Sequence, residues 1–250
     1  MSRLGVLAFG DSITNGGGEL QWGVALQSWA LWVARGLGLA FTTYAVDGAS
    51  AEHVAHAQLP AFLARTATPD GRYDLGCLYV GVNDVRRPDW DPAAFAADHA
   101  FALDALAARC DRLLVVTLPE DLGRPRAPGV AEANAIVEAA ARARGALVLD
   151  LRAFGARNLV MVDHVHPTAF GQVWIAERAL DVLAADGMDV RVRPSTLISP
   201  AGGTRKQRLQ GDWTYVYRRL KEQARALRAG AGPVRRVARA ASARTGSSGT

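Results

Sequence analysis

Cysteines and long apolar runs are both scarce in this sequence. Two cysteines, Cys77 and Cys110, occur in 250 residues. That number is too small for a disulfide framework, so we expect two buried, reduced thiols. No apolar run approaches the ~18 residues that a membrane-spanning helix needs. The first apolar segment begins at Leu4 and leaves no room for a removable secretion signal, so the expected location is cytoplasmic. Five scattered histidines form no metal-ligand pattern, and we expect no metal site.

Charge is distributed unevenly along the sequence. Residues 191–250 hold 14 Lys and Arg against 2 acidic residues, whereas residues 1–190 hold 15 basic and 22 acidic residues. The change in sign coincides with the turn-forming residues Pro200-Ala201-Gly202-Gly203. Half of all residues are hydrophobic, which is enough to bury one core of ordinary size. The sequence therefore predicts one globular domain over residues 1–190 and a basic C-terminal extension over 191–250.

Short apolar runs alternate with longer segments of helical period through the first 185 residues. This alternation is typical of repeated strand–helix units and predicts an α/β fold with a five-stranded parallel sheet. The expected strands are 4–9, 40–46, 75–80, 113–118 and 146–151. The expected helices are 22–37, 51–59, 92–108, 130–144 and 168–185.

Chemically distinctive residues follow several of the expected strands. Ser12 follows the first strand, Gly48 the second and Asn83 the third, while Asp163 and His166 lie between the fifth strand and the last helix. In a parallel sheet, ligands bind where loops leave the carboxyl ends of the strands. We therefore expect these five residues to converge on one edge of the sheet.

Ser12, His166 and Asp163 are the residue types of a nucleophilic hydrolase site. His166 would take the proton of the Ser12 hydroxyl, and Asp163, three residues before His166, would orient the imidazole and offset its charge. The alternative interpretation is structural: Asp11 and Ser12 would cap a helix or shape a turn, and His166 would be a surface residue beside a proline.

An oxyanion needs fixed hydrogen-bond donors, and three candidates precede the expected helices. These are the backbone N–H groups of Ser12 and Gly48 and the side-chain amide of Asn83. Glycine at 48 allows a close approach of the backbone. Asn83-Asp84 taken alone is an ordinary turn dipeptide.

Taken together, four sequence blocks resemble those of the SGNH hydrolases, also called GDSL esterases and lipases. The blocks are Gly10-Asp11-Ser12, Gly48, Gly81-Val82-Asn83-Asp84 and Asp163-His164-Val165-His166-Pro167, and the resemblance covers about residues 4–185. It implies a three-layer flavodoxin-like fold, a triad of Ser12, His166 and Asp163, and an oxyanion hole from Ser12, Gly48 and Asn83. It also implies hydrolysis of a small-molecule ester without metal or cofactor. Ile13 stands where the family name has Leu, and Asp47 stands where Asn is common.

Other features bear on the substrate. Trp22 and Trp90 are candidate walls of an acyl or aryl pocket, and Gly16 to Gly18 are expected to form a flexible rim beside Ser12. The glycines also suggest a phosphate-binding loop, but no Gly-Lys-Ser/Thr or G-x-G-x-x-G spacing follows, and Glu19 would repel an anion.

Residues 213–228 of the extension have the pattern of a basic amphipathic helix. Three interpretations remain: a helix packed on the acidic domain, attachment to an anionic membrane surface, or weak nucleic-acid binding, which no recognised motif supports. The composition beyond Pro233 predicts disorder. The competing function for the whole chain is a binding protein that keeps the fold without turnover and attaches through this tail.

Overall fold

The computed structural model describes residues 4–21, 23–65, 71–123, 127–156 and 158–199. The chain divides into residues 1–203 and residues 204–250. The second part, with the expected helix at 213–228, lies outside the described residues.

Five parallel strands form a single sheet in the described part of the chain. They are β1 (Val6–Gly10), β2 (Phe41–Thr43), β3 (Leu75–Tyr79), β4 (Leu113–Val116) and β5 (Leu147–Leu149), in the order β2-β1-β3-β4-β5. The order reverses at β1, which pairs with β2 on one side and β3 on the other. This is the flavodoxin-like order, and its reversal point is where such sheets bind ligands.

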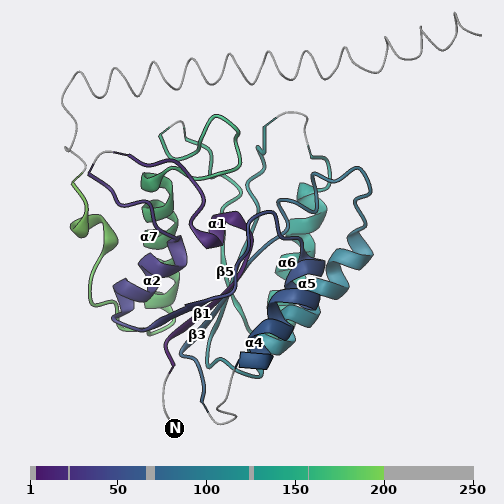
Figure 1. Ribbon diagram of the computed structural model, residues 1–250, viewed down its shortest axis with the longest axis horizontal. Coiled ribbons are helices and arrows are strands. Elements are labelled where there is room, and N and C mark those ends of the chain that lie inside the picture. The colour runs from purple at the N-terminus through teal and green to yellow at the C-terminus, as the bar shows by residue number, and fades with distance from the viewer. Residues whose placement is uncertain (1–3, 22, 66–70, 124–126, 157, 200–250) are drawn as a thin grey trace, which may run out of the picture. The chain divides into compact units, whose positions relative to one another are not determined.

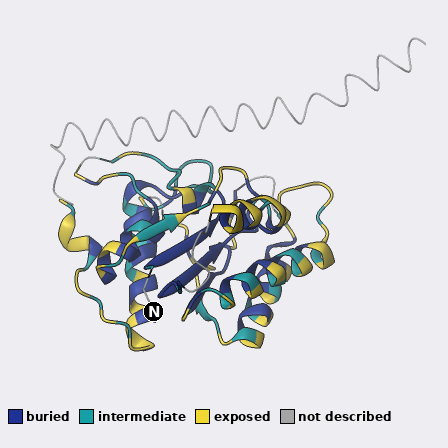
Figure 2. Cartoon of the chain, turned by 60° about the horizontal axis from the view of Figure 1, so that its bottom comes forward, coloured by how far each residue is buried: buried dark blue, intermediate teal, exposed yellow. Residues whose placement is uncertain are grey.

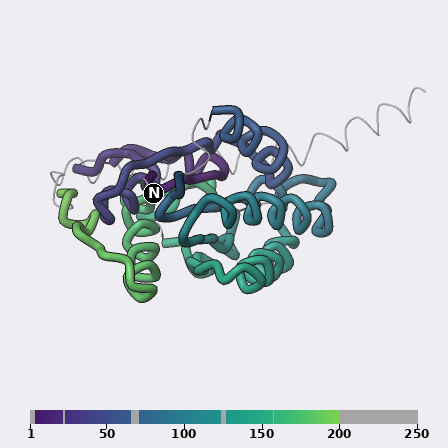
Figure 3. The backbone as a smooth tube through the Cα atoms, turned by 90° about the horizontal axis from the view of Figure 1, so that it is seen from below, coloured from purple at the N-terminus to yellow at the C-terminus, as the bar shows by residue number. Residues whose placement is uncertain are grey.

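Helices cover both faces of the sheet, so the α/β three-layer expectation is confirmed (Figure 1). On one face α2 (Trp29–Leu37) packs against α7 (Ala169–Ala185). On the other face α5 (Pro92–Ala107) packs against α6 (Val130–Arg144), and α3 (Ala51–His53) lies beside α5. Figure 3 shows the two groups on opposite sides of the sheet, with α7 in green and α6 in teal.

The core lies between these layers. Every residue of β1, β3 and β4 is buried, whereas β2 and β5 at the edges are partly exposed (Figure 2). Strands covered on both faces need apolar side chains in both directions, which explains why their sequences run apolar without alternation. Cys77 and Cys110 are buried free thiols, as expected, and burial raises the pKa of Cys110 to about 12.

Three elements are shorter than their expected ranges. The segment expected as a helix over 22–37 becomes helical only at Trp29, because Ser28 caps α2 by accepting the N–H of Ala30. The strand expected over 40–46 keeps its regular pairing only over β2. There the Thr43 hydroxyl accepts the N–H of Ala45, although Val46 N still donates to Gly10 O at the end of β1. The fifth strand is likewise confined to Leu147–Leu149.

The helix expected over 51–59 is longer and irregular. It runs through α3, a π-helical turn η1 (Val54–Gln58) and α4 (Leu59–Arg65). Pro60 has no N–H to donate four residues back, and the π turn shifts the bonding register so that Leu59 N donates to Val54 O. The remaining helices match the expected ranges closely, with Thr168 serving as the N-cap of α7.

Residues 191–199 pack on the folded domain. Arg191 and Val192 donate to Gly36 O, and Arg193 pairs with Glu177 and Asp181 of α7. A short 3-10 turn η2 (Pro194–Leu197) follows and contacts α2 and α7. Among the described helices, none is both long and apolar enough to cross a membrane.

Candidate active site

Ser12 lies directly beyond the end of β1, where this strand turns into the short helix α1 (Ser12–Asn15). Gly10 makes the turn with φ +153°, and a Cβ there would lie 2.2 Å from the carbonyl oxygen of Tyr79. Asp11 caps α1, because its Oδ1 accepts the N–H of Ile13 at 2.9 Å. The structural interpretation of Asp11 as a cap is thus correct, and the same cap presents Ser12 beyond the sheet edge.

Three side chains form a hydrogen-bonded series, which we call the Ser–His–Asp array. Ser12 Oγ lies 2.9 Å from His166 Nε2, and His166 Nδ1 lies 2.7 Å from Asp163 Oδ2. The serine and the histidine are 154 positions apart in the sequence. The fold therefore brings together the three residues that the sequence singled out, within hydrogen-bonding distance of one another.

The loop that carries Asp163 and His166 is organised by Asp163 itself. Its Oδ1 accepts the backbone N–H groups of Val165 at 2.9 Å and His166 at 3.0 Å, while Oδ2 is left for the imidazole. His164 between them has φ +59°, the one positive φ at a non-glycine residue in the described part of the chain. This left-handed residue reverses the backbone, and its strain is of the kind that functional loops hold.

Electrostatics favour an ion pair at this position. The hydrogen bond to Asp163 raises the pKa of His166, with partial burial opposing the effect. Burial disfavours the Asp163 carboxylate, but the bonds from His166 and the two backbone N–H groups outweigh it and lower the Asp163 pKa. The arrangement is suited to an imidazole that accepts a proton while Asp163 stays ionised.

Gly48 and Asn83 lie on two loops that are bonded to each other. Asn83 Nδ2 donates to Ala49 O at 3.0 Å, and Asp84 Oδ1 accepts the N–H of Ala51 at 3.0 Å. Gly48 has φ +76°, and a Cβ there would have no heavy atom within 4 Å. Glycine is therefore required by the backbone conformation and not by crowding. Asp47 accepts from Asn15 of α1 at 2.9 Å, which ties this loop to the helix of Ser12.

A family model described as the GDSL-like lipase/acylhydrolase family matches residues 8–174. That span runs from within β1 to within α7 and holds every residue of the array. The chain belongs to this family. Membership makes it a carboxylic ester hydrolase and confirms the family resemblance of its sequence blocks. Among curated proteins, no sequence match was found.

Solved structures of the same fold include a lipolytic G-D-S-L family protein, an acetylxylan esterase and an α/β hydrolase. A member of the lipolytic G-D-S-L family from Veillonella parvula is 22% identical, covers 72% of this chain and 98% of its own, and has a TM-score of 0.59. A catalytic mutant of Axe2, an acetylxylan esterase from Geobacillus stearothermophilus, is 18% identical, covers 76% of this chain and 97% of its own, and has a TM-score of 0.57. LAE5, an α/β hydrolase from the Lake Arreo metagenome, is 17% identical over 72% and 94%, with a TM-score of 0.55. These identities show a shared fold.

The glycine segment after Ser12 in this GDSL-like acylhydrolase is packed, contrary to the expected flexible rim. Gly17 N donates to Ser12 O at 2.7 Å, and a Cβ at Gly17 would lie 3.4 Å from His166 Cδ2. A Cβ at Gly18 would lie 2.3 Å from Pro167 O. Because the glycines let this segment close over Ser12 and His166, their role is close approach and not mobility.

The two tryptophans proposed as pocket walls have different outcomes. Trp22 lies outside the described residues. Trp90 is half-buried, donates to Glu132 of α6 at 3.2 Å and packs against the Phe95 ring at a tilt of 51°. It lines a hollow of about 390 Å³ that also includes Ser50 and Asp84 but no residue of the array. Contact of either tryptophan with a substrate stays a prediction.

Sequence reasoning missed two buried glutamines near Ser12, and it missed the burial of Asp11. Asp11 is 1% exposed, and burial raises its pKa to about 7. Gln58 and Gln172 are buried and bond to the turn that carries Ser12. A glutamine inside an otherwise apolar helical stripe was the available signal. Across the described residues, no group of three or more His, Cys, Asp or Glu is arranged to hold a metal.

Proposed function

We propose that this chain hydrolyses small-molecule carboxylic esters through an acyl-enzyme intermediate on Ser12. The observation that carries the proposal is the Ser–His–Asp array, with 2.9 Å between Ser12 Oγ and His166 Nε2 and 2.7 Å between His166 Nδ1 and Asp163 Oδ2. A serine hydroxyl is a weak nucleophile in water, and an adjacent base held by a third group is what activates it.

The reaction proceeds in two halves. Ser12 Oγ attacks the carbonyl carbon while its proton passes to His166 Nε2, and collapse of the tetrahedral intermediate expels the alcohol, which takes that proton. Water then attacks the acyl-enzyme, gives its proton to His166 and releases the carboxylic acid as Ser12 regains its proton. Asp163 stays ionised throughout and offsets the imidazolium charge.

The oxyanion is held by the backbone N–H groups of Ser12 and Gly48 and by Asn83 Nδ2. The bond to Ala49 O uses one of the two Asn83 amide hydrogens and fixes the amide plane. Donors that are fixed before the reaction begins need no rearrangement as charge develops, and loss of one costs roughly 3 kcal/mol of barrier.

Acetyl esters are the substrates to examine first. Two acetylxylan esterase structures of Axe2 share the fold, and that likeness motivates a panel of p-nitrophenyl esters of increasing acyl length together with acetylated saccharides.

The test is turnover of this panel by the wild type, Ser12→Ala and Ser195→Ala. Ser195 is exposed on the η2 turn and serves as the matched control. The proposal expects loss of turnover in Ser12→Ala only. A purified, folded wild type without turnover on any ester would instead support the binding protein that lacks catalysis.

A further inference from the structure

Two buried glutamines hold the turn that carries the proposed nucleophile. This turn, Gly10 to Gly17, follows β1 and includes α1, and we call it the nucleophile turn. Gln58 is 3% exposed and Gln172 is 0% exposed. They come from opposite layers of the fold, since Gln58 ends the π turn η1 and Gln172 lies in the first turns of α7.

Gln58 is hydrogen-bonded to the start of the nucleophile turn. Its Oε1 accepts the N–H of Gly10 at 3.2 Å, and its Nε2 donates to Gly10 O at 2.8 Å. Both backbone groups of Gly10 are thus bonded by one side chain. The π turn places Gln58 for this contact, because it shifts the helical register by one residue immediately before Leu59.

Gln172 is hydrogen-bonded to the backbone of the turn beyond Ser12. Its Nε2 donates to Ile13 O and to Gly17 O, each at 3.0 Å, and its Oε1 accepts the N–H of Trp29 at 2.8 Å. The first two bonds reach the backbone on the C-terminal side of Ser12. Gln172 is also six residues after His166, so one rigid helix start connects the base to the nucleophile turn.

A turn of this kind cannot hold its own geometry. Helix α1 has four residues, and helices this short are not stable without outside contacts. Catalytic groups must be held within about 0.5 Å of their productive positions, and a misplacement of about 1 Å can reduce the rate about 100-fold. The distance from Ser12 Oγ to His166 Nε2 therefore depends on what the turn is bonded to.

We propose that Gln58 and Gln172 are positioning residues that fix Ser12 Oγ relative to His166 Nε2. The inference rests on the proposed function of Ser12 as nucleophile. It assigns the two amides to the rate of the chemical step and not to substrate binding, because both side chains are buried beneath the turn and bond to its backbone.

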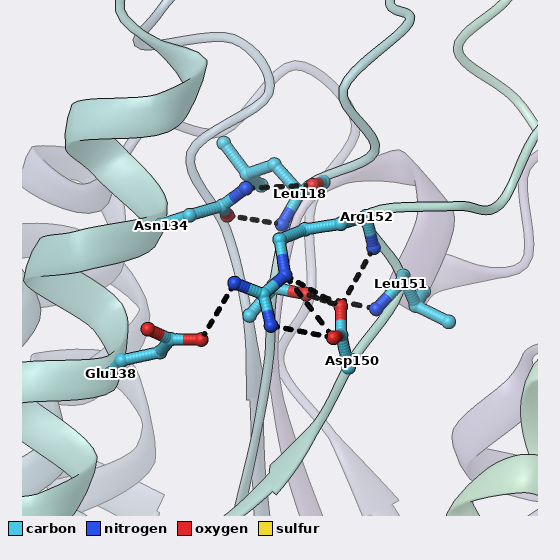
Figure 4. A network of polar contacts seen from close by, with 7 residues as sticks. Leu118, Asn134, Glu138, Asp150, Leu151 and Arg152 are labelled. Carbon is cyan, nitrogen blue, oxygen red and sulfur yellow. Dashed lines mark hydrogen bonds and ion pairs between the residues drawn. The ribbon is translucent and has the colours of Figure 1, made fainter.

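The same molecule contains a matched control. Asn134 of α6 is 3% exposed and bonds both backbone groups of Leu118, just beyond β4, at 2.7 and 2.9 Å (Figure 4). The neighbouring Asp150 and Arg152 pair with each other there. This amide does for β4 what Gln58 does for β1, but it bonds to no residue of the nucleophile turn. Loss of a buried amide bond pair can therefore be compared with and without a connection to Ser12.

The experiment uses substitutions of similar shape: Gln58→Met, Gln172→Met and, as control, Asn134→Leu. Each variant is assayed where urea unfolding shows it to be fully folded, for kcat and KM on a p-nitrophenyl ester and for the rate constant of organophosphate labelling. We expect Gln58→Met and Gln172→Met to lower kcat and the labelling rate constant about 10- to 100-fold, with KM changed less than about threefold. Asn134→Leu should lose stability but keep kcat within about twofold.

Gln58→Asn and Gln172→Asn provide a second pair if a methionine variant does not fold. Asparagine keeps a buried amide, but its side chain is one methylene shorter and draws that amide away from the backbone of the nucleophile turn, so kcat should again fall. Equal kcat losses in the glutamine and Asn134 variants would overturn the inference, as would a loss confined to KM. If the wild type is active and Ser12→Ala is not, the proposed function stands whatever the glutamine variants show. An inactive, unlabelled wild type would mean that both fail.

Discussion

At the scale of single residues, Asp163 both shapes its own loop and sets the charge beside His166. Its two carboxylate oxygens accept three hydrogen bonds from its own loop, and it is only partly exposed. Its negative charge raises the pKa of His166 through the 2.7 Å contact. A general base acts in its neutral form, so the pKa of His166 sets the pH below which we expect activity to fall.

The pH dependence of kcat/KM should report this contact. His166 is protonated below its pKa, and because that pKa is raised, activity should begin to fall at a pH above the ordinary imidazole value of 6.5. In Asp163→Asn the acid side of the kcat/KM profile should move to lower pH, because the imidazole loses its charge partner. The maximum of kcat/KM should drop at least about 100-fold, because the tautomer of the imidazole is no longer fixed.

Asp98→Asn is the control for this substitution, since Asp98 pairs with His56 on the surface at 3.1 Å. It should leave the profile unchanged. An acid limb at the same pH in wild type and Asp163→Asn would contradict the assigned pairing.

Asp11 makes a separate prediction for stability. Burial raises its pKa from 3.8 to about 7, so the folded state favours the neutral carboxyl. Stability from this group is complete below the unfolded pKa and is lost as pH rises toward 7. Asn keeps the cap to Ile13 N without the charge. Asp11→Asn should therefore gain roughly 3 kcal/mol relative to wild type between pH 5 and pH 8 in urea unfolding. If the difference in free energy of unfolding between Asp11→Asn and wild type is the same at pH 5 and pH 8, the pKa of Asp11 is not raised by folding.

Much of the site could be predicted at this scale because its residues have distinctive chemistry. Ser12, Asp163 and His166 have few other uses at the carboxyl end of parallel strands, and they meet as expected. The capping role of Asp11 was among the interpretations of the sequence, but the roles of Gln58 and Gln172 were not predictable, because they depend on which backbone groups the two amides face after folding. No local pattern of residues records such contacts.

At the scale of elements, the nucleophile turn and the start of α7 are packed together. Gln172 of α7 donates to Ile13 O and Gly17 O of the turn, and just beyond the turn Ala169 N donates to Glu19 O, where Gly17 and Gly18 leave no side chain between the two segments. This packing brings His166 next to Ser12, although the two residues are 154 positions apart in the sequence. Element contacts, and not only the array, therefore set the geometry.

Gly17→Ala should disturb that geometry. Its Cβ would lie 2.8 Å from the backbone oxygen of Ser12, so the segment must move away from Ser12, and at 3.4 Å the same Cβ would already be in contact with His166 Cδ2. We expect kcat to fall about tenfold or more. Gly155→Ala is the control, because a Cβ there meets nothing within 4 Å. Wild-type kcat in Gly17→Ala would show that the segment can shift without moving the array.

The elements themselves were predictable where length and apolar period agree, as in α5, α6 and β3. The misses have local causes. Ser28, inside the segment 22–37, caps α2 and delays its start. Pro60 has no backbone N–H to donate, and the helix continues through the π turn η1 into α4, which ends at Arg65. The apolar period reports neither the capping bond nor the missing donor.

At the scale of the whole molecule, the basic extension can be separated from the chemistry. The array and the proposed oxyanion donors all lie within the span matched by the family model. Deletion of residues 205–250 should keep ester turnover within about twofold and abolish any binding to anionic liposomes, with neutral liposomes as control. Loss of solubility or turnover on deletion would instead indicate that the tail packs on the enzyme domain.

The account depends most on the proposal that Ser12 is the nucleophile, and the most direct test is covalent labelling. Wild type is treated with diethyl p-nitrophenyl phosphate, released p-nitrophenol is counted, and the modified peptide is located by mass spectrometry. We expect one diethylphosphoryl group per chain, on the peptide that contains Ser12, and no label in Ser12→Ala. An active enzyme that is labelled elsewhere, or is not labelled at all, would contradict the account.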